Sequence, residues 1–291
     1  MEKVRKLTNW LQEKNHFAYY AAIFRIFLAF HIIKKTHLNW SSCSVFFDGA
    51  KAQYDKYPSS LSFLVQNFQG IPILIILLTL FCCLWMFGIG RHLVALLIFI
   101  CLFLYNDVYS DLLNGGDNLL FFISIYMVFI DSYQYFSLSR SSGGPTRNVL
   151  SNLGVLSIMM HLCLIYWVSG FHKIHADDWF NGVATYYIWH LDRFSSPLNT
   201  YFYNNSFIIA ASTYVTVLFE IFFPALVWFK NTRGFMLLLG LVLHIGIYFT
   251  MMIYDFEVLF IFVYGFWIAD ETWMNIGAKL SNRWKVLAKA S

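Results

Sequence analysis

The chain has 291 residues, of which 59% are hydrophobic, 20% are aromatic and only 12% are charged, with a formal net charge of +4. That charged share is about half of what a soluble domain carries, and it cannot cover the surface of a water-soluble fold of this length. The composition therefore excludes a soluble enzyme, gives no reason to expect a nucleic-acid partner, and predicts an all-α polytopic membrane protein.

Apolar runs, taken in chain order, predict eight transmembrane helices. A bilayer core requires about 20 predominantly apolar residues per helix. Runs near this length lie at 17–36, 71–89, 92–106, 117–136, 149–171, 206–229, 234–252 and 256–270. The third and eighth runs are short and could instead be partly interfacial, so the count can change by one. The expected organisation is an interfacial helix over 1–16, a transmembrane domain over 17–270 and a basic interfacial tail over 271–291.

The positions of the charges predict an orientation. With the N-terminus inside, most Lys and Arg residues fall in the two chain ends and the inner loops, whereas the outer loops at 107–117 and 253–257 are purely acidic. This is the positive-inside pattern. We therefore expect a protein integral to the plasma (inner) membrane, with both termini in the cytoplasm and with its polar chemistry at the extracytoplasmic face.

The segment between the fifth and sixth runs, residues 166–205, does not resemble a simple connecting loop. It is long and rich in aromatic, His and Asp residues, and residues 179–190 are apolar on one side. Structured segments of this length in compact domains are usually functional. The pattern predicts a re-entrant or interfacial helix at the outer face.

Lys173 is the first candidate for chemistry in this segment. A lysine in a low-dielectric site can lose its proton and act as a base; the alternative is a lysine whose stem lies along the membrane interface. His172 and His175 share a helical face, and acidic residues follow them, but nothing fixes a third converging ligand. We therefore expect no metal.

Several ionisable residues fall inside or beside the apolar runs, where charges are costly and usually face the protein interior. Glu220 is the strongest of these candidates and is expected to pair with Arg25 or with a histidine. A purely structural ion pair between helices is the alternative for each of them. The others are His31, His161, His244 and, in the outer loop on the same side as Lys173, Asp117.

The segment GFHKIHADDW at residues 170–179, followed by Gly182, resembles the membrane domain of vitamin K-dependent γ-glutamyl carboxylase. More broadly, the chain resembles the HTTM (horizontally transferred transmembrane) domain family from about residue 17 to residue 270. By this resemblance, Lys173 matches the lysine of the carboxylase that is proposed to deprotonate vitamin K hydroquinone, a reduced naphthoquinone. His244 matches a histidine near the quinone.

Two functional hypotheses follow from this resemblance. In the first, the protein is a membrane enzyme that takes a reduced naphthoquinone from the lipid and modifies a secreted peptide. Lys173, His172 and His244 would be catalytic, and the quinone pocket would include Trp179, Glu220, Asp117, Arg25 and His161. In the second, the protein is a non-catalytic factor for the maturation or export of a secreted peptide toxin, like the short SdpB-like members, and works with a soluble partner protein. A transporter ranks last, because no inverted repeat or broken helix is evident.

Overall fold

The computed structural model describes residues 2–38, 70–109, 113–194 and 196–290. These residues form α-helices, short 3-10 helices and irregular segments, and none of them lies in a strand. The all-α prediction is therefore confirmed for the described part of the chain. The chain divides into two compact units, Met1–Ser157 with Ile268–Ser291, and Ile158–Trp267.

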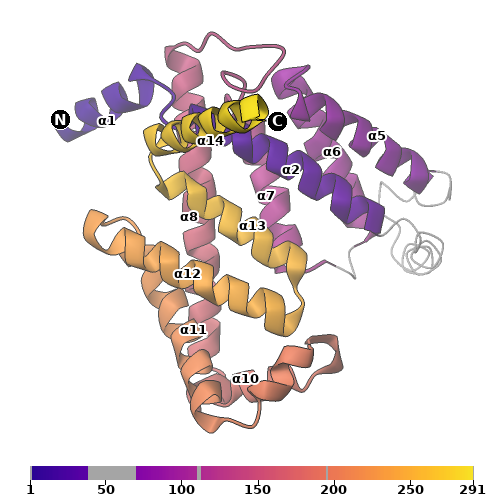
Figure 1. Cartoon of the computed structure of the whole chain (residues 1–291), viewed down its shortest axis with the longest axis vertical. Helices are drawn as coiled ribbons and strands as arrows, with labels where there is room; N and C mark the ends of the chain where they lie inside the picture. The colour runs from indigo at the N-terminus through magenta and orange to yellow at the C-terminus, as the bar shows by residue number, and fades with distance from the viewer. Residues whose placement is uncertain (1, 39–69, 110–112, 195, 291) are drawn as a thin grey trace. The chain divides into compact units, whose positions relative to one another are not determined.

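The first unit contains most of the N-terminal helices (Figure 1). They are α1 (Glu2–Glu13), α2 (Ala18–Leu38), α5 (Gly70–Met86), α6 (Arg91–Val108), α7 (Gly115–Phe129), the first half of α8 (Pro145–Ile174), and α14 (Asp270–Ala290). Helix α5 packs on α2 and α6, and α6 packs on α7. The predicted run at 117–136 is too long, because helix α7 ends at Phe129.

The early end of α7 has a physical cause in the first unit. Arg25, on α2, is fully buried, and its guanidinium donates hydrogen bonds to the carbonyls of Ser132 at 2.6 Å and of Phe136 at 2.5 Å. Carbonyls within a helix are already occupied by helical hydrogen bonds. The non-helical segment after α7 therefore supplies the acceptors that a buried cation requires, and Arg25 pairs with backbone oxygens instead of with the predicted Glu220.

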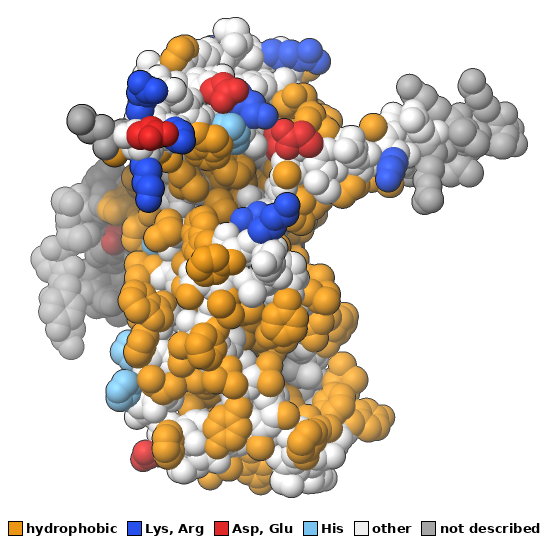
Figure 2. All heavy atoms as spheres, turned by 90° about the vertical axis from the view of Figure 1, so that its left-hand side faces the viewer, with side chains coloured by type: hydrophobic (Ala, Val, Ile, Leu, Met, Phe, Trp, Pro, Cys, Tyr) orange, Lys and Arg blue, Asp and Glu red, His pale blue; other side chains and the backbone are white. Residues whose placement is uncertain are grey.

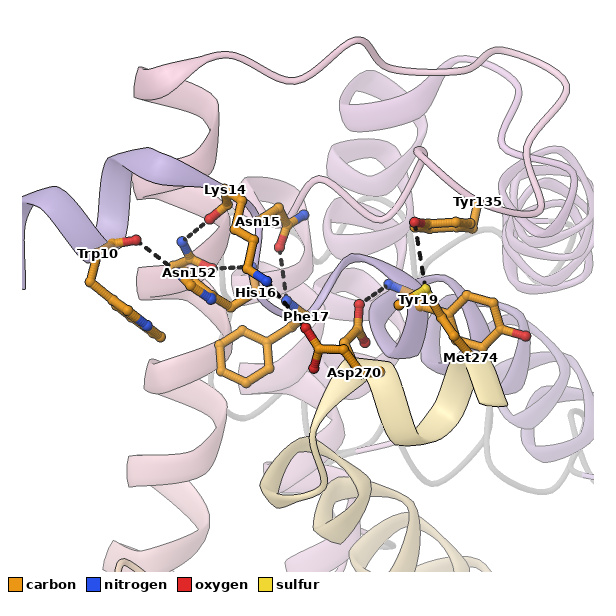
Figure 3. Close-up of polar contacts among 11 residues, drawn as sticks. Trp10, Lys14, Asn15, His16, Phe17, Tyr19, Tyr135, Asn152, Asp270 and Met274 are labelled. Atoms are coloured by element: carbon orange, nitrogen blue, oxygen red, sulfur yellow. Dashed lines mark hydrogen bonds and ion pairs between the residues drawn. The ribbon is translucent and has the colours of Figure 1, made fainter. Parts of the chain in front are cut away.

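Side chains also fix the bend between α1 and α2 (Figure 3). Asn152, on α8, accepts from the backbone N–H of His16 at 3.0 Å and donates to the carbonyl of Lys14 at 2.8 Å. Asp270, the first residue of α14, accepts from the backbone N–H groups of Tyr19 and Tyr20 at 2.7 and 2.8 Å. Both N–H groups lie in the first turn of α2, where helical hydrogen bonding supplies no acceptor, so Asp270 caps that helix from the far end of the chain. Burial raises the pKa of the Asp270 carboxyl, and the two N–H donors only partly oppose this.

The second unit contains the rest of α8 and the helices that follow it (Figure 1). They are α9 (Asp177–Phe180), α10 (Ala184–Trp189), η3 (Asp192–Phe194), η4 (Pro197–Tyr201), α11 (Ser206–Leu226), α12 (Lys230–Met251), α13 (Tyr254–Tyr264) and η5 (Gly265–Trp267). Helix α12 packs against α11 and α13, and α10 packs against α11.

Three of the described helices are long and apolar enough to cross a bilayer, namely α8, α11 and α12, with 30, 21 and 22 residues. The bent pair of α1 and α2, which meet at 61°, makes a fourth if it is one span. Hydrophobic side chains cover most of the second unit on the face drawn in Figure 2. On α12, Phe235 and Leu238 are 64% and 60% exposed, as expected of a surface in contact with lipid acyl chains. These features indicate a membrane protein. A helix lies at each of the eight predicted runs, but eight spans remain a prediction.

Candidate functional site

Lys173 lies in the last turn of α8 and forms an ion pair with Glu220 on α11. Its Nζ atom is 2.5 Å and 2.7 Å from the two carboxylate oxygens of Glu220, and it donates to Ser169 Oγ at 2.7 Å. The two side chains of the pair are only 20% and 12% exposed. The sequence predicted a buried partner for Glu220 but named the wrong one, since the partner is Lys173 and neither Arg25 nor a histidine.

A glycine one turn before Lys173 makes this pairing possible. A Cβ atom on Gly170 would lie 2.9 Å from Ile221 Cγ1, 3.2 Å from the Ile221 nitrogen and 3.3 Å from Glu220 Cβ. No side chain fits there without a shift of α8 away from α11. Gly170 therefore allows the close approach of the two helices that brings the ammonium and the carboxylate into contact. This gives a physical role to the spacing of three residues between Gly170 and Lys173.

The Lys173–Glu220 pair forms part of the wall of a cavity of about 440 Å³ within the second unit. The polar groups in its wall are few and include Lys173, Glu220 and Glu257, whereas most of the lining is apolar. Apolar lining residues include Ile188, Trp189, Phe202, Ile247 and Phe256. A cavity of this size, mostly apolar with a few convergent polar groups, is typical of small-molecule sites.

Trp179 forms another part of the cavity wall, and its ring lies 5.0 Å from Lys173 Nζ in cation–π geometry. Residues 179–190 are not the single helix predicted from the sequence. They form the end of α9 and all of α10, separated at Gly182, whose φ of +74° favours glycine. A Cβ atom on Gly182 would also lie 2.8 Å from the ring of Tyr214. This break turns the chain so that both Trp179 and Trp189 line the cavity.

His244, on α12, lies behind the cavity wall in a buried hydrogen-bonded cluster. Its Nδ1 atom contacts Glu257 Oε2, and its Nε2 atom lies 2.6 Å from the hydroxyl oxygen of Tyr166. Glu257 was predicted in the acidic outer loop at 253–257, but it lies in α13 and is 1% exposed. The sequence carried one usable signal for this, because the predicted apolar run over 256–270 already includes Glu257.

The other predicted site residues are not gathered at this cavity. His172 lines a separate surface hollow with Trp167 and Phe171, and His161 is half-buried on α8. Arg25 and Asp117 belong to the first unit. Asp117 forms a capping box with Asn114 at the start of α7, and its carboxylate forms an ion pair with Lys35. The local bonds of Arg25 and Asp117 are sufficient to explain why both are buried.

The described residues contain no group of three or more His, Cys, Asp or Glu side chains arranged to hold a metal. His175, which the sequence placed beside His172, donates from Nδ1 to the carbonyl of Phe171 at 2.7 Å. Comparison of the chain with protein-family models, with curated proteins and with solved structures gave no match.

Proposed function

We propose that this protein is an HTTM-type membrane protein that binds a lipid-soluble molecule in the Lys173 cavity and uses Lys173 to remove a proton from it. The observation that carries this proposal is a largely buried Lys173–Glu220 ion pair in the wall of a mostly apolar cavity. An apolar cavity selects a hydrophobic ligand, and a lysine with a carboxylate partner supplies a site that can exchange a proton. A structural ion pair alone would not require the adjacent cavity.

The residues around the cavity fit a reduced naphthoquinone. Trp179, Trp189 and Phe202 provide aromatic surfaces for a flat bicyclic ring, and Lys173 and Glu220 provide polar partners for a ring hydroxyl. When bound, such a molecule would supply the reducing equivalents for a reaction with oxygen. Within the protein, transfer of the ammonium proton from Lys173 to Glu220 leaves a neutral amine, which can then accept the proton of a ligand hydroxyl.

The membrane topology belongs to the same proposal. Helices α2, α5, α6, α7, α8, α11, α12 and α13 would each span the plasma (inner) membrane, with both termini in the cytoplasm. The positive-inside rule then places Lys173 at the extracytoplasmic end of α8, where a secreted peptide substrate has access. Labelling with a membrane-impermeant maleimide tests this in a cysteine-free background. Tyr201→Cys should react in intact cells and Arg140→Cys should not, and the reverse result would contradict the topology.

The function is tested by anaerobic incubation of the purified protein with reduced menadione, followed by oxygen and product analysis. Wild type should convert reduced menadione and oxygen into menadione 2,3-epoxide and water, and Lys173→Met should not. Lys230→Met is the matched control, because Lys230 is an exposed lysine at the start of α12 and does not line the cavity. It should retain wild-type product formation.

The non-catalytic hypothesis predicts a different result. If wild type is folded but forms no epoxide, the protein is not an enzyme of this class, and the factor for maturing or exporting a secreted peptide becomes the better account. A search for a secreted peptide and a soluble partner protein by co-purification would then follow.

A further inference from the structure

A continuous chain of four buried polar side chains runs through the second unit. Tyr264 and Tyr166 hydroxyl oxygens are 2.5 Å apart, and Tyr166 Oη is 2.6 Å from His244 Nε2. His244 Nδ1 in turn contacts the carboxylate of Glu257. The four residues are between 1% and 5% exposed and come from three helices, α8, α12 and α13.

Aromatic rings pack around the Tyr166 and His244 part of this chain. The Tyr166 ring packs at 4.9 Å from Phe223 and at 5.6 Å from Phe260, and the His244 ring packs at 5.2 Å from Phe260. Space for the end of the chain comes from Gly240 on α12, where a Cβ atom would lie 2.5 Å from the Tyr264 hydroxyl. Buried polar groups are costly unless each is hydrogen-bonded, and an apolar residue would fill the same volume at no such cost.

The hydrogen atoms of the chain can adopt two arrangements. A tyrosine hydroxyl carries one hydrogen, so Tyr166 either donates to His244 Nε2 or accepts from it. In the first arrangement His244 is neutral and donates from Nδ1 to the Glu257 carboxylate. In the second, one more proton is present, His244 is an imidazolium, and Tyr166 accepts from Nε2. The chain can therefore hold one additional proton by turning the hydroxyl groups of Tyr166 and Tyr264, without moving a heavy atom.

One member of the chain reaches the cavity. Glu257 lines the same cavity as Lys173 and Glu220. His244 contacts Glu257 from behind the cavity wall. Glu220 on α11 and Cys163 on α8 are the other ionisable groups that interact electrostatically with the tyrosine end of the chain. A ligand in the cavity therefore meets two separate proton-exchanging groups, the Lys173–Glu220 pair and Glu257.

We propose that Glu257 is a second proton acceptor of the cavity, and that His244, Tyr166 and Tyr264 are positioning residues that hold the Glu257 carboxylate in place and set its affinity for the proton. The inference rests on the proposed function, since a hydroquinone carries two hydroxyl groups on opposite sides of its ring. Lys173 accepts the proton of one hydroxyl, and Glu257 accepts the other. The broken O–H bond leaves its electron pair on the ligand oxygen. The proton forms an O–H bond with the Glu257 carboxylate, while His244 Nδ1 keeps its own hydrogen and continues to donate it to that carboxyl group.

The test uses the full chain in lipid nanodiscs and separates ligand binding, turnover and proton storage. Reduced menadione binding is measured anaerobically by quenching of tryptophan fluorescence, and its oxidation is measured after oxygen is added. Glu257→Gln should lower the oxidation rate at least about tenfold, as expected for loss of an acid–base group, while the dissociation constant changes by less than about twofold. Tyr264→Phe should move the midpoint of the pH–rate profile. Tyr248→Phe is the control, because Tyr248 lies on the same helix as His244 but outside the hydrogen-bonded chain. It should change neither the oxidation rate nor the midpoint of the pH–rate profile.

A second readout does not need the ligand. The ring nitrogens of His244 are followed by ¹⁵N NMR as the pH is changed, and the signal is identified by its absence in His244→Gln. Glu257→Gln and Gly240→Ala should each change the pH at which this signal converts from imidazole to imidazolium. If wild type does not bind reduced menadione but the NMR shifts occur, the proposed function fails and proton storage by the chain stands. The inference is overturned if Glu257→Gln oxidises the hydroquinone at the wild-type rate. It is also overturned if the pH at which the His244 signal converts is the same in wild type, Glu257→Gln and Gly240→Ala. Neither result affects the role of Lys173.

Discussion

Replacing Gly170 with alanine would place a methyl group where α8 and α11 leave no room for one. The new Cβ atom would lie 2.9 Å from Ile221 Cγ1 and 3.2 Å from the Ile221 backbone nitrogen. Relief of these contacts requires a small separation of the two helices or a strained rotamer, which costs about 1–3 kcal/mol in a well-packed interior. The same separation lengthens the contact between Lys173 and Glu220.

Gly234→Ala provides the matched control for this substitution. Gly234 is also a helical glycine in the second unit, but no atom lies within 4 Å of the Cβ position that alanine would add. Both replacements add one methyl group to a helix and remove the same backbone freedom, worth up to about 1 kcal/mol. The difference in unfolding free energy between the two variants therefore isolates the steric cost, which we expect to be about 1–3 kcal/mol in favour of Gly234→Ala.

The assay is thermal unfolding of the two purified variants in the same detergent, together with the binding of reduced menadione. Gly170→Ala should unfold at the lower temperature and bind the hydroquinone more weakly, whereas Gly234→Ala should match or exceed wild type in stability. Equal stability and equal binding for both variants would refute the close approach of α8 and α11 as the cause of the Lys173–Glu220 pairing.

Three further predictions concern buried polar groups. In a double-mutant cycle, Lys173→Met and Glu220→Gln should each lower the unfolding free energy by about 2–4 kcal/mol, because each leaves one half-buried group without its partner. The double variant should lose less than the sum of the two single losses. Additive effects would contradict a direct ion pair. Asp270→Ala should cost about 0.5–2 kcal/mol through loss of the α2 cap. Because the folded-state pKa of Asp270 is raised above its ordinary 3.8, the folded state retains this proton longer, so its contribution to stability is present below pH 3.8 and is lost as the pH rises through the raised value. Asp270→Asn should remove that part of the pH dependence of thermal unfolding. Arg25→Met should lower the unfolding free energy by at least about 3 kcal/mol, because it deletes two charge-assisted hydrogen bonds to backbone carbonyls. Arg25→Lys should recover only part of this loss. An Arg25→Met variant as stable as wild type would contradict the role of these hydrogen bonds.

The sequence alone determined the features that depend on local pattern. Composition and the length of apolar runs predicted an all-α membrane protein, and a helix lies at each predicted run, because hydropathy and helix formation are set by neighbouring residues. The position of Lys173 just past an apolar run also identified it as a candidate for chemistry.

The tertiary structure decided which polar groups meet. Lys173 pairs with Glu220 because Gly170 lets two helices approach, and no local pattern specifies which helix approaches which. Arg25 binds the carbonyls of the non-helical segment after α7, and Glu257 is buried because α12 and α13 pack together around its contact with His244. A buried charge signals that it has a partner, but the identity of that partner is fixed only by helix packing between residues far apart in the chain.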